Sequence, residues 1–410
     1  MRDAERVLAA AVASASLFCA ATAGSAAGVV FEPTRKDDPV PGKCKPDDCS
    51  LREAITAANE RDGLDKVVLG AGRYRIQIPE TTGDDNSGGD FDVSDRIDIT
   101  GKGPEKTIVD GRDVSRVITL ATFAPKTVRS LTIEDGLVTG SGGGIFSGPN
   151  KATIKNVVVR SNTATESGGG IRSVSAKLNL VKSTITQNKA LLGGGVHLTN
   201  GAAIPPLASI RASTISSNQR ELGGGLYVDG TDESIFVVKP TAEIANSTFA
   251  NNLAPVSGGG IAAIQGAVVR LDHSTVSYNK ADTDNSGGGA GGGLFQSSGA
   301  DFDGSDTIVA ANQLGTSALG GPQCYGTYGG VLLLGGSVDD CLYTGGAVPD
   351  LMLGPLADNG GPTQTIALLE GSNAIDAENL TDCPPSDQRG ETRNPEKCDF
   401  GAFERKARDP

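Results

Sequence analysis

The sequence predicts an all-β fold: a right-handed, single-stranded parallel β-helix with a short N-terminal capping helix and an irregular, disulfide-containing C-terminal cap. Three observations lead to this prediction. A phrase close to Ser-Thr-apolar-x-x-Asn recurs through the middle of the chain, and three consecutive glycines follow each copy. Aromatic residues make up 4% of the 410 residues, and tryptophan is absent. A core of thin repeated layers is built from small aliphatic side chains, so this composition fits stacked coils.

The repeated phrase sets the period of the coils. Its clearest copies span residues 183–188, 213–218, 247–252 and 274–279. Successive side chains of a strand point to opposite faces, so the central apolar residue points inward and the hydroxyls point outward. One copy cannot bury its apolar face alone, but stacked copies build a continuous core. The expected inward residues are Ile133, Val159, Ile185, Ile215, Phe249 and Val276.

The turns of the coils carry their own signals. Glycine triplets such as 193–195 allow corners with positive φ, where a Cβ would meet the neighbouring coil. These triplets and the β-branched runs exclude helical solenoids, and the blades of a β-propeller, the alternative, are longer and have four strands each. An asparagine at the same turn of successive coils predicts a ladder of stacked side-chain amides. The expected ladder is Asn162, Asn188, Asn218, Asn252 and Asn279.

The ends of the chain depart from the repeat. Residues 1–27 fit a signal peptide, because Arg2 and Arg6 precede an apolar, alanine-rich run that ends in small residues. Residues 28–92 are expected to form an N-terminal cap, in which Ser50 and Glu53 make a capping box that predicts a helix near residues 50–59. Residues 93–314 are expected to form the β-helix repeats. Residues 315–410 are expected to form C-terminal coils and a cap.

The cysteines also favour export. Removal of the signal peptide leaves an even number of them, which in an exported chain indicates disulfides. Their spacing does not fit a metal site. Six cysteines allow 15 pairings, and we expect sequence neighbours to pair. The six residues are Cys44, Cys49, Cys324, Cys341, Cys383 and Cys398.

Charge and hydropathy limit the partners. The net charge of −13 argues against nucleic acid or an anionic membrane, since phosphates are bound by clustered Lys and Arg. After residue 27 no stretch reaches the ~18 apolar residues that span a bilayer, so the mature chain is expected to have no transmembrane segment. We expect a monomer that is secreted, extracellular or on the cell surface, with the periplasm as an alternative.

Three stretches resemble family signatures. Residues 49–54, CSLREA, resemble the hallmark of CSLREA-domain proteins, and the repeats resemble those of polymorphic outer membrane proteins. The segments 360–365 (GGPTQT), 371–376 (GSNAID), 387–390 (DQRG) and 398–404 (CDFGAFE) are similar to the choice-of-anchor Q domain of bacterial surface proteins. The resemblance implies an exported, surface- or outer-membrane-associated β-helix of the pectin-lyase type, without an assigned reaction. Because no sorting tail follows residue 404, release or non-covalent retention at the surface is expected.

No catalytic set stands out in the sequence. Hydrolysis of a glycosidic bond needs two carboxylates that face each other, and the adjacent pair Asp339 and Asp340 fits a solvated turn better. Arginines are spread along the coils without an evident carboxylate ladder beside them. Both histidines are expected at ordinary surface or turn positions. These residues are Arg160, Arg172, Arg211, Arg270, His197 and His273.

Two structural sites are expected. Asp282, Asp284 and Ser286 place oxygen atoms at alternate positions, as at the start of a calcium loop, although the closing bidentate Glu is missing. Structural Ca²⁺ is the only cofactor that the sequence suggests. In the C-terminal part, carboxylates and an arginine are expected to form salt bridges that close the last coil. These residues are Asp387, Arg389, Asp399 and Glu404.

Two functions remain open at this point. The first is a non-enzymatic, adhesin-like or glycan-binding protein whose outward Thr, Ser and Asn side chains contact a polysaccharide, a surface glycan or a protein. The second is a pectate-lyase-like polysaccharide lyase or a glycoside hydrolase. Several carboxylates and an arginine converging in one groove would favour the second, and a flank of hydroxyls would favour the first. The sequence leans toward a protein without catalytic activity.

Overall fold

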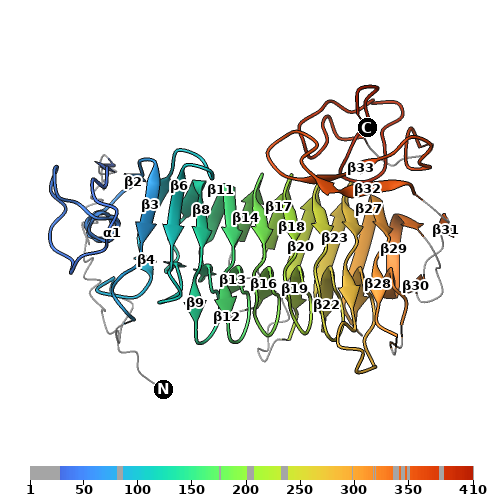
Figure 1. The fold of residues 1–410 in the computed structure, drawn as a ribbon, viewed down its shortest axis with the longest axis horizontal. Helices are drawn as coiled ribbons and strands as arrows, with labels where there is room; N and C mark the ends of the chain where they lie inside the picture. Colours follow the sequence, from blue (N-terminus) through green and yellow to red (C-terminus); the bar gives the residue numbers. More distant parts are fainter. Residues whose placement is uncertain are drawn as a thin grey trace, which may run out of the picture.

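The computed structural model describes residues 28–409, except 81–85, 175–176, 201–206, 232–238, 298, 317, 319, 336–340, 343–346, 349–350 and 378–382. The expected signal peptide, residues 1–27, therefore lies outside the described residues. The described chain winds into a right-handed parallel β-helix (Figure 1). Among the described strands, every pairing except that of β32 (Leu353–Ala357) with β33 (Thr365–Leu368) is parallel. The predicted fold class is confirmed.

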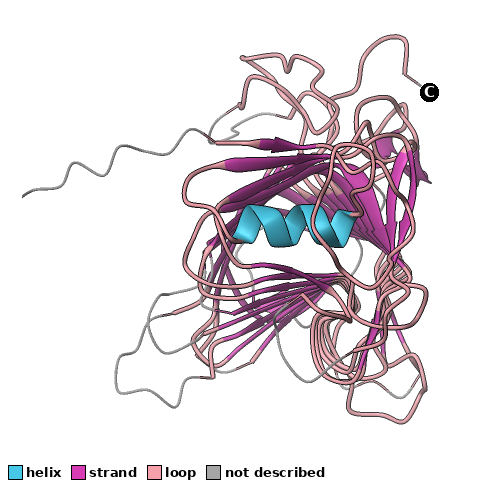
Figure 2. Cartoon of the chain, turned by 90° about the vertical axis from the view of Figure 1, so that its left-hand side faces the viewer, coloured by secondary structure: helices cyan, strands magenta, loops and turns pink. Residues whose placement is uncertain are grey.

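Each coil contributes to three stacked faces, which meet at corners (Figure 2). Face 1 consists of β2 (Asp65–Val68), β5 (Ile97–Thr100), the first parts of β8 (Lys126–Glu134) and β11 (Lys151–Arg160), β14 (Lys177–Val181), β17 (Leu207–Arg211), β20 (Thr241–Ala245), β23 (Val268–Asp272) and the start of β27 (Asp301–Ala310). Face 2 consists of β3 (Gly72–Arg75), β6 (Thr107–Asp110), the ends of β8, β11 and β27, β15 (Thr184–Thr186), β18 (Thr214–Ser216), β21 (Thr248–Ala250) and β24 (Thr275–Ser277). Face 3 consists of β4 (Phe91–Val93), β7 (Ile118–Leu120), β10 (Ile145–Ser147), β13 (Ile171–Val174), β16 (Val196–Thr199), β19 (Leu226–Asp229), β22 (Ile261–Ile264) and β26 (Leu294–Gln296).

Short strands extend these faces. β1 (Val30–Phe31) pairs with β2, and β29 (Cys324–Gly335) continues the last coil toward β30 (Cys341–Leu342) and β31 (Ala347–Val348). Two further pairs lie in the turns between faces 2 and 3, β9 (Leu137–Val138) with β12 (Thr163–Ala164) and β25 (Lys280–Ala281) with β28 (Gln313–Leu314). These turns project from the coils and form an edge of their own.

The core runs through the centre of the coils as a single apolar column. The six residues expected to point inward are all fully buried in it, from Ile133 on β8 to Val276 on β24. Strand alternation places their neighbours outward, which is why a six-residue phrase is enough to define the interior.

The helix α1 (Leu51–Asn59) closes the N-terminal end of this column. In Figure 2 it lies across the opening of the first coils. The Ser50 side chain accepts from the Glu53 amide, and the Glu53 carboxylate accepts from the Ser50 amide at 2.8 Å. Leu51, Ala54 and Ile55 are buried against the core, so the helix protects apolar side chains and strand edges that an open end would expose.

The corner between faces 2 and 3 holds a continuous amide ladder. The Nδ2 atom of Asn188 donates to Oδ1 of Asn218 at 3.0 Å, and Asn218 donates in the same way to Asn252 at 3.0 Å. Each Oδ1 atom also accepts from the backbone amide of the preceding asparagine, as in the 3.0 Å bond from the Asn188 amide to Asn218. The ladder runs through Asn162, Asn188, Asn218, Asn252, Asn279 and Asn312 and ends on Gln323.

The C-terminal cap is irregular and contains a disulfide, as predicted, but it does not close the last coil. It lies along the outside of face 2, above the coils from β18 to β27 (Figure 1). Gln388 donates to the Thr214 hydroxyl at 2.9 Å and accepts from the Thr248 hydroxyl at 2.7 Å. The expected position was wrong because these contacts join residues more than 100 positions apart, and no local pattern encodes them.

Two disulfides have both partners among the described side chains. Cys44 pairs with Cys49 ahead of the capping helix, and Cys383 pairs with Cys398 inside the C-terminal cap. Cys324 is disulfide-bonded as well. The side chain of Cys341, its expected partner, lies outside the described side chains.

Candidate functional site

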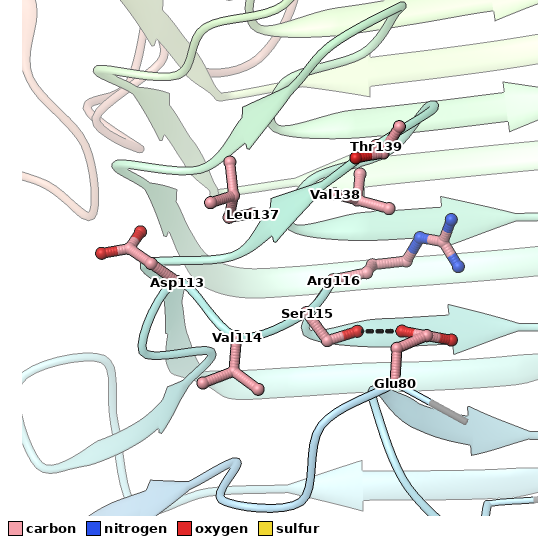
Figure 3. A pocket seen from close by; sticks show the side chains of 8 residues that line it. All are labelled: Glu80, Asp113, Val114, Ser115, Arg116, Leu137, Val138 and Thr139. Carbon is pink, nitrogen blue, oxygen red and sulfur yellow. Dashed lines mark hydrogen bonds between the residues drawn. The ribbon is translucent and has the colours of Figure 1, made fainter.

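A pocket of 460 Å³ opens on the outside of the second and third coils (Figure 3). Two projecting turns, residues 113–116 and 137–139, form its walls together with Glu80. Val114 and Leu137 expose apolar surface there, while Glu80 is hydrogen-bonded to the Ser115 hydroxyl. Arg116 is anchored by Asp90 at 3.2 Å and lies over the ring of Phe146. The lining therefore combines apolar and charged groups.

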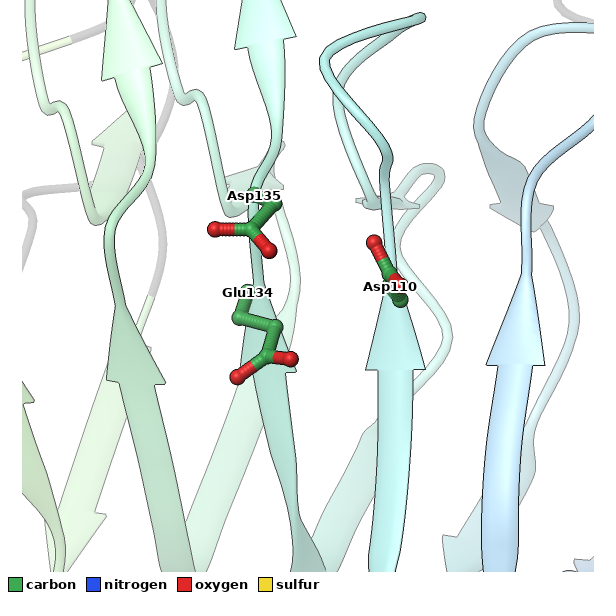
Figure 4. Close-up of side chains that lie close together, drawn as sticks. All are labelled: Asp110, Glu134 and Asp135. Atoms are coloured by element: carbon green, nitrogen blue, oxygen red, sulfur yellow. The ribbon is translucent and has the colours of Figure 1, made fainter.

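On the first four coils, from β3 to β11, acidic and basic side chains converge on the outside of face 2. Asp110 ends β6, and Glu134 and Asp135 follow one another at the end of β8 (Figure 4). Their nearest carboxylate oxygens all lie within 4.8 Å of one another. Arg73 on β3 donates to Asp110 at 2.9 Å and also to Glu134, and Arg160 on β11 donates to Glu134 at 2.7 Å. We call these five residues the carboxylate–arginine cluster.

Strand register produces this cluster. Asp110 pairs with Glu134, and Glu134 pairs with Arg160, so the three occupy one outward column on successive coils. Later coils place Thr186 and Ser216 in the same column. The cluster is thus a departure of the first copies of the repeat from the hydroxyl pattern of the later ones.

Burial and exposure divide the cluster into a base and a rim. The side chains of Asp110 and Glu134 are 8% and 4% exposed, whereas those of Arg73 and Arg160 are 32% and 43% exposed. The hydrogen bond to Asp110 is the main cause that raises the pKa of Arg73. Burial, and then the nearby charge of Glu134, raise the pKa of Asp135. The carboxylates hold the guanidinium groups in place, and the arginine side chains remain partly exposed.

The acidic members of the cluster are also the described residues best placed to bind a metal ion. Carboxylate oxygens within 4.8 Å of one another suit a divalent cation. However, Arg73 and Arg160 already neutralise Asp110 and Glu134. A cation would have to displace these guanidinium groups, so the arrangement fits a salt-bridge network better than a metal centre.

The expected calcium loop has a different geometry. Oδ1 of Asp282 accepts from the Gly287 amide at 3.1 Å, and Oδ1 of Asp284 accepts from the Ser286 amide at 3.1 Å. Asp282 is buried, whereas Asp284 and Ser286 are exposed. Each carboxylate thus closes a turn of its own backbone, and calcium at these residues stays a prediction.

The C-terminal cap brings together the four residues expected there. Oδ2 of Asp387 accepts from Arg389 Nε at 2.9 Å and from the Glu404 amide at 3.0 Å. The Arg389 guanidinium lies 3.7 Å from the centre of the Phe403 ring. The Asp399 carboxylate accepts hydrogen bonds from the backbone amides of Asp376 and Arg405, and burial raises its pKa to about 6. An additional residue, Arg393, joins Glu404 at 3.3 Å and completes the network.

Three expectations about outward side chains are wrong. Thr214, Thr248 and Thr275 are covered by the C-terminal cap, so this hydroxyl column is not free to contact a ligand. Arg160 does have carboxylates beside it, because strand pairing brings Glu134 next to it. His197 is not at the surface but buried on face 3, whereas His273 does stand at a turn but is buried there under the cap, with Nε2 3.6 Å from Cys398 Sγ. Alternation gives the direction of a side chain but not what covers it.

The fold is shared with a solved structure. The chain superposes on pectate lyase Pel9A with a TM-score of 0.54 at 13% identity, over 93% of this chain and 98% of that chain. The A-module of the mannuronan C-5 epimerase AlgE6 from Azotobacter vinelandii gives a TM-score of 0.33 at 14% identity, over 73% and 96% of the two chains. The ORF18 protein of Geobacillus virus E2 gives 0.36 at 11% identity, over 74% and 61%. The pectate lyase likeness shows the β-helix fold alone.

No family model and no curated protein matches the chain. The resemblances of residues 49–54 and of the C-terminal segments therefore stay predictions. No helix among the described residues is long and apolar enough to cross a membrane.

Proposed function

We propose that this protein is an exported β-helix that binds polysaccharide through the carboxylate–arginine cluster and the adjoining pocket. The observation that carries the proposal is the fixed position of Arg73 and Arg160, whose guanidinium groups are held by buried carboxylates and remain partly exposed. A guanidinium group presents several donors in one plane and suits sugar hydroxyls and carboxylates. Because the carboxylates fix these donors in advance, little conformational entropy is lost on binding.

The pocket supports the same ligand class. Its volume of 460 Å³ falls in the range of small-molecule sites. A sugar ring has apolar C–H faces and a polar rim, which matches Val114 and Leu137 next to Glu80 and Arg116. The backbone amide of Asp113, which lines the pocket, donates a 2.8 Å hydrogen bond to the carbonyl of Asp135, which belongs to the cluster. The pocket and the cluster are therefore contiguous, and a polymer can occupy both.

Two further observations agree with the proposal. One solved structure that shares the fold over nearly the whole chain is a pectate lyase. The disulfides Cys44–Cys49 and Cys383–Cys398 favour an oxidising compartment, and thus export.

Cleavage of the bound polysaccharide is a second candidate function. Three carboxylates converge with two arginines, which is the arrangement that favours a lyase or hydrolase over a hydroxyl-lined binding surface. A carboxyl group with a raised pKa can act as a general acid, and Asp135 is the member of the cluster with this property.

The test is a panel of acidic and neutral polysaccharides, with and without Ca²⁺, read by calorimetry and by new reducing or unsaturated ends. Arg160→Ala removes one donor of the cluster, and Arg270→Ala removes an exposed arginine of face 1 as the matched control. We expect at least one polysaccharide to bind, with roughly ten- to a hundredfold weaker binding for Arg160→Ala only. Equal binding by both variants would refute this site, and product formation would establish the second candidate.

A further inference from the structure

A second group of ionisable side chains lies on the outside of face 3. Arg172, His197 and Tyr227 occupy matched positions on β13, β16 and β19, so they form one column across successive coils. Their strand neighbours Val196 and Leu198 belong to the core, and the column therefore points outward. None of these residues belongs to the carboxylate–arginine cluster, which lies on face 2.

Although they point outward, His197 and Tyr227 are only 2% exposed. Part of the reason is the glycine corner of each coil. A Cβ on Gly193 would stand 2.9 Å from His197 Cβ, and one on Gly223 would stand 2.8 Å from Tyr227 Cβ. Both glycines have positive φ, so only glycine lets the backbone pack against these side chains.

The polar atoms of this column are buried without partners. Among the described residues, Nη1 of Arg172 and both ring nitrogens of His197 have no hydrogen-bond partner. The His197 Nε2 atom lies 4.0 Å from Asp229 Oδ2, beyond hydrogen-bonding distance. Burial lowers the pKa of Arg172 to about 10 and that of His197 well below its usual value of 6.5, so the imidazole is neutral. Unpaired buried donors are costly, and a stable fold does not need them.

We propose that Arg172 and His197 form a second binding site, which takes the carboxylate group of an acidic sugar. One carboxylate accepts from Arg172 Nη1 and from a ring N–H of His197, and so satisfies both orphaned donors. Tyr227 packs against the imidazole, with ring centres 4.7 Å apart, and holds its orientation. That the ligand is a carbohydrate rests on the proposed function. That it carries a carboxylate follows from the two unpaired donors of this site alone.

The site can be tested by NMR because the chain has only two histidines. The Cε1–Hε1 signal of His197 reports on the site, and that of His273, buried under the C-terminal cap, reports on the fold. The probes are galacturonate, its neutral counterpart galactose, and acetate. We expect galacturonate to shift the His197 signal but not the His273 signal, acetate to do so more weakly, and galactose to leave both unchanged.

Arg172→Ala is the diagnostic variant, and Arg211→Ala, an exposed arginine of face 1, is its control. We expect Arg172→Ala to weaken galacturonate binding by about tenfold or more, and the control to leave it unchanged. Should Arg172→Ala disturb the His273 signal, Arg172→Lys replaces it with the same expected weakening. An unmoved His197 signal, an equal shift by galactose, or unchanged binding by the Arg172 variant would overturn the proposal. Polysaccharide binding by Arg160→Ala tests the carboxylate–arginine cluster alone, whereas galacturonate binding by Arg172→Ala tests the Arg172–His197 site. A failure of the proposed function can therefore be told apart from a failure of this second site.

Discussion

Replacing Asn218 with alanine tests how much the amide ladder stabilises the coils. Asn218 is fully buried, and its side chain takes part in four hydrogen bonds, each 3.0 Å long. Its Oδ1 atom accepts from the backbone and side-chain amides of Asn188, and its Nδ2 atom donates to the Ile185 carbonyl and to Asn252. Truncation to alanine removes all four at once.

Three of the four partner groups keep another contact. Nδ2 of Asn188 also donates to the Val159 carbonyl, and Oδ1 of Asn252 still accepts from the backbone amide of residue 218. The Asn188 backbone amide loses its acceptor, whereas the Ile185 carbonyl stays in the parallel pairing of β15 with β18. At about 1–3 kcal/mol for one buried group left unsatisfied, Asn218→Ala should lower the free energy of unfolding by roughly 1–3 kcal/mol.

The assay is urea denaturation followed by circular dichroism, with Asn179→Ala as control. Asn179 is half-buried on face 1 and makes a single 3.4 Å side-chain contact with Thr153, so its loss should change stability by about 0.5 kcal/mol or less. If Asn218→Ala lowered the free energy of unfolding no more than the control does, the reasoning would be refuted. The buried ladder would then contribute no more than a single contact of a half-buried side chain.

Three further predictions concern the C-terminal cap. Arg389→Ala leaves the buried carboxylate of Asp387 without its cationic partner and should cost about 3–5 kcal/mol, measured by thermal unfolding; a change in activity at unchanged stability would contradict the structural role. Reduction of Cys383–Cys398 should lower the local stability of the cap by up to about 3 kcal/mol, so that a protease digests the cap faster; an unchanged digestion rate would contradict this. The pKa of Asp399 is raised to about 6 from about 3.9 in the unfolded chain, so its stabilising contribution is present below pH 4 and is lost as the pH rises through 6. We therefore expect the difference in unfolding free energy between the wild type and Asp399→Asn to fall by up to about 3 kcal/mol from pH 4 to 7. A difference that stays constant with pH would contradict the raised pKa of Asp399.

The β-helix could be predicted because its determinants are local and repeated. One phrase per coil specifies an inward residue such as Ile185, an outward hydroxyl and a corner asparagine such as Asn188, and the stacking of coils repeats each contact. The capping helix was predictable for the same reason, since Ser50 and Glu53 stand three positions apart.

The candidate site could not be predicted in the same way. Arg73 and Glu134 are 61 positions apart, and they meet only because β3, β6 and β8 stack in a particular register. The signal that was available is the replacement of a hydroxyl by Glu134 in the first copy of the phrase. The position of the C-terminal cap depends on contacts such as that of Gln388 with Thr214, 174 positions away, for which the sequence holds no periodic signal.

The most direct test of polysaccharide binding at face 2 is hydrogen–deuterium exchange with and without the polysaccharide that binds best in the panel. We predict slower exchange in residues 107–116 and 132–139, which carry the three carboxylates of the carboxylate–arginine cluster and the walls of the pocket. The same segments should be unprotected when Arg160→Ala is used in place of the wild type. Protection confined to face 1 or to the C-terminal cap would contradict the assignment of this surface as the binding site.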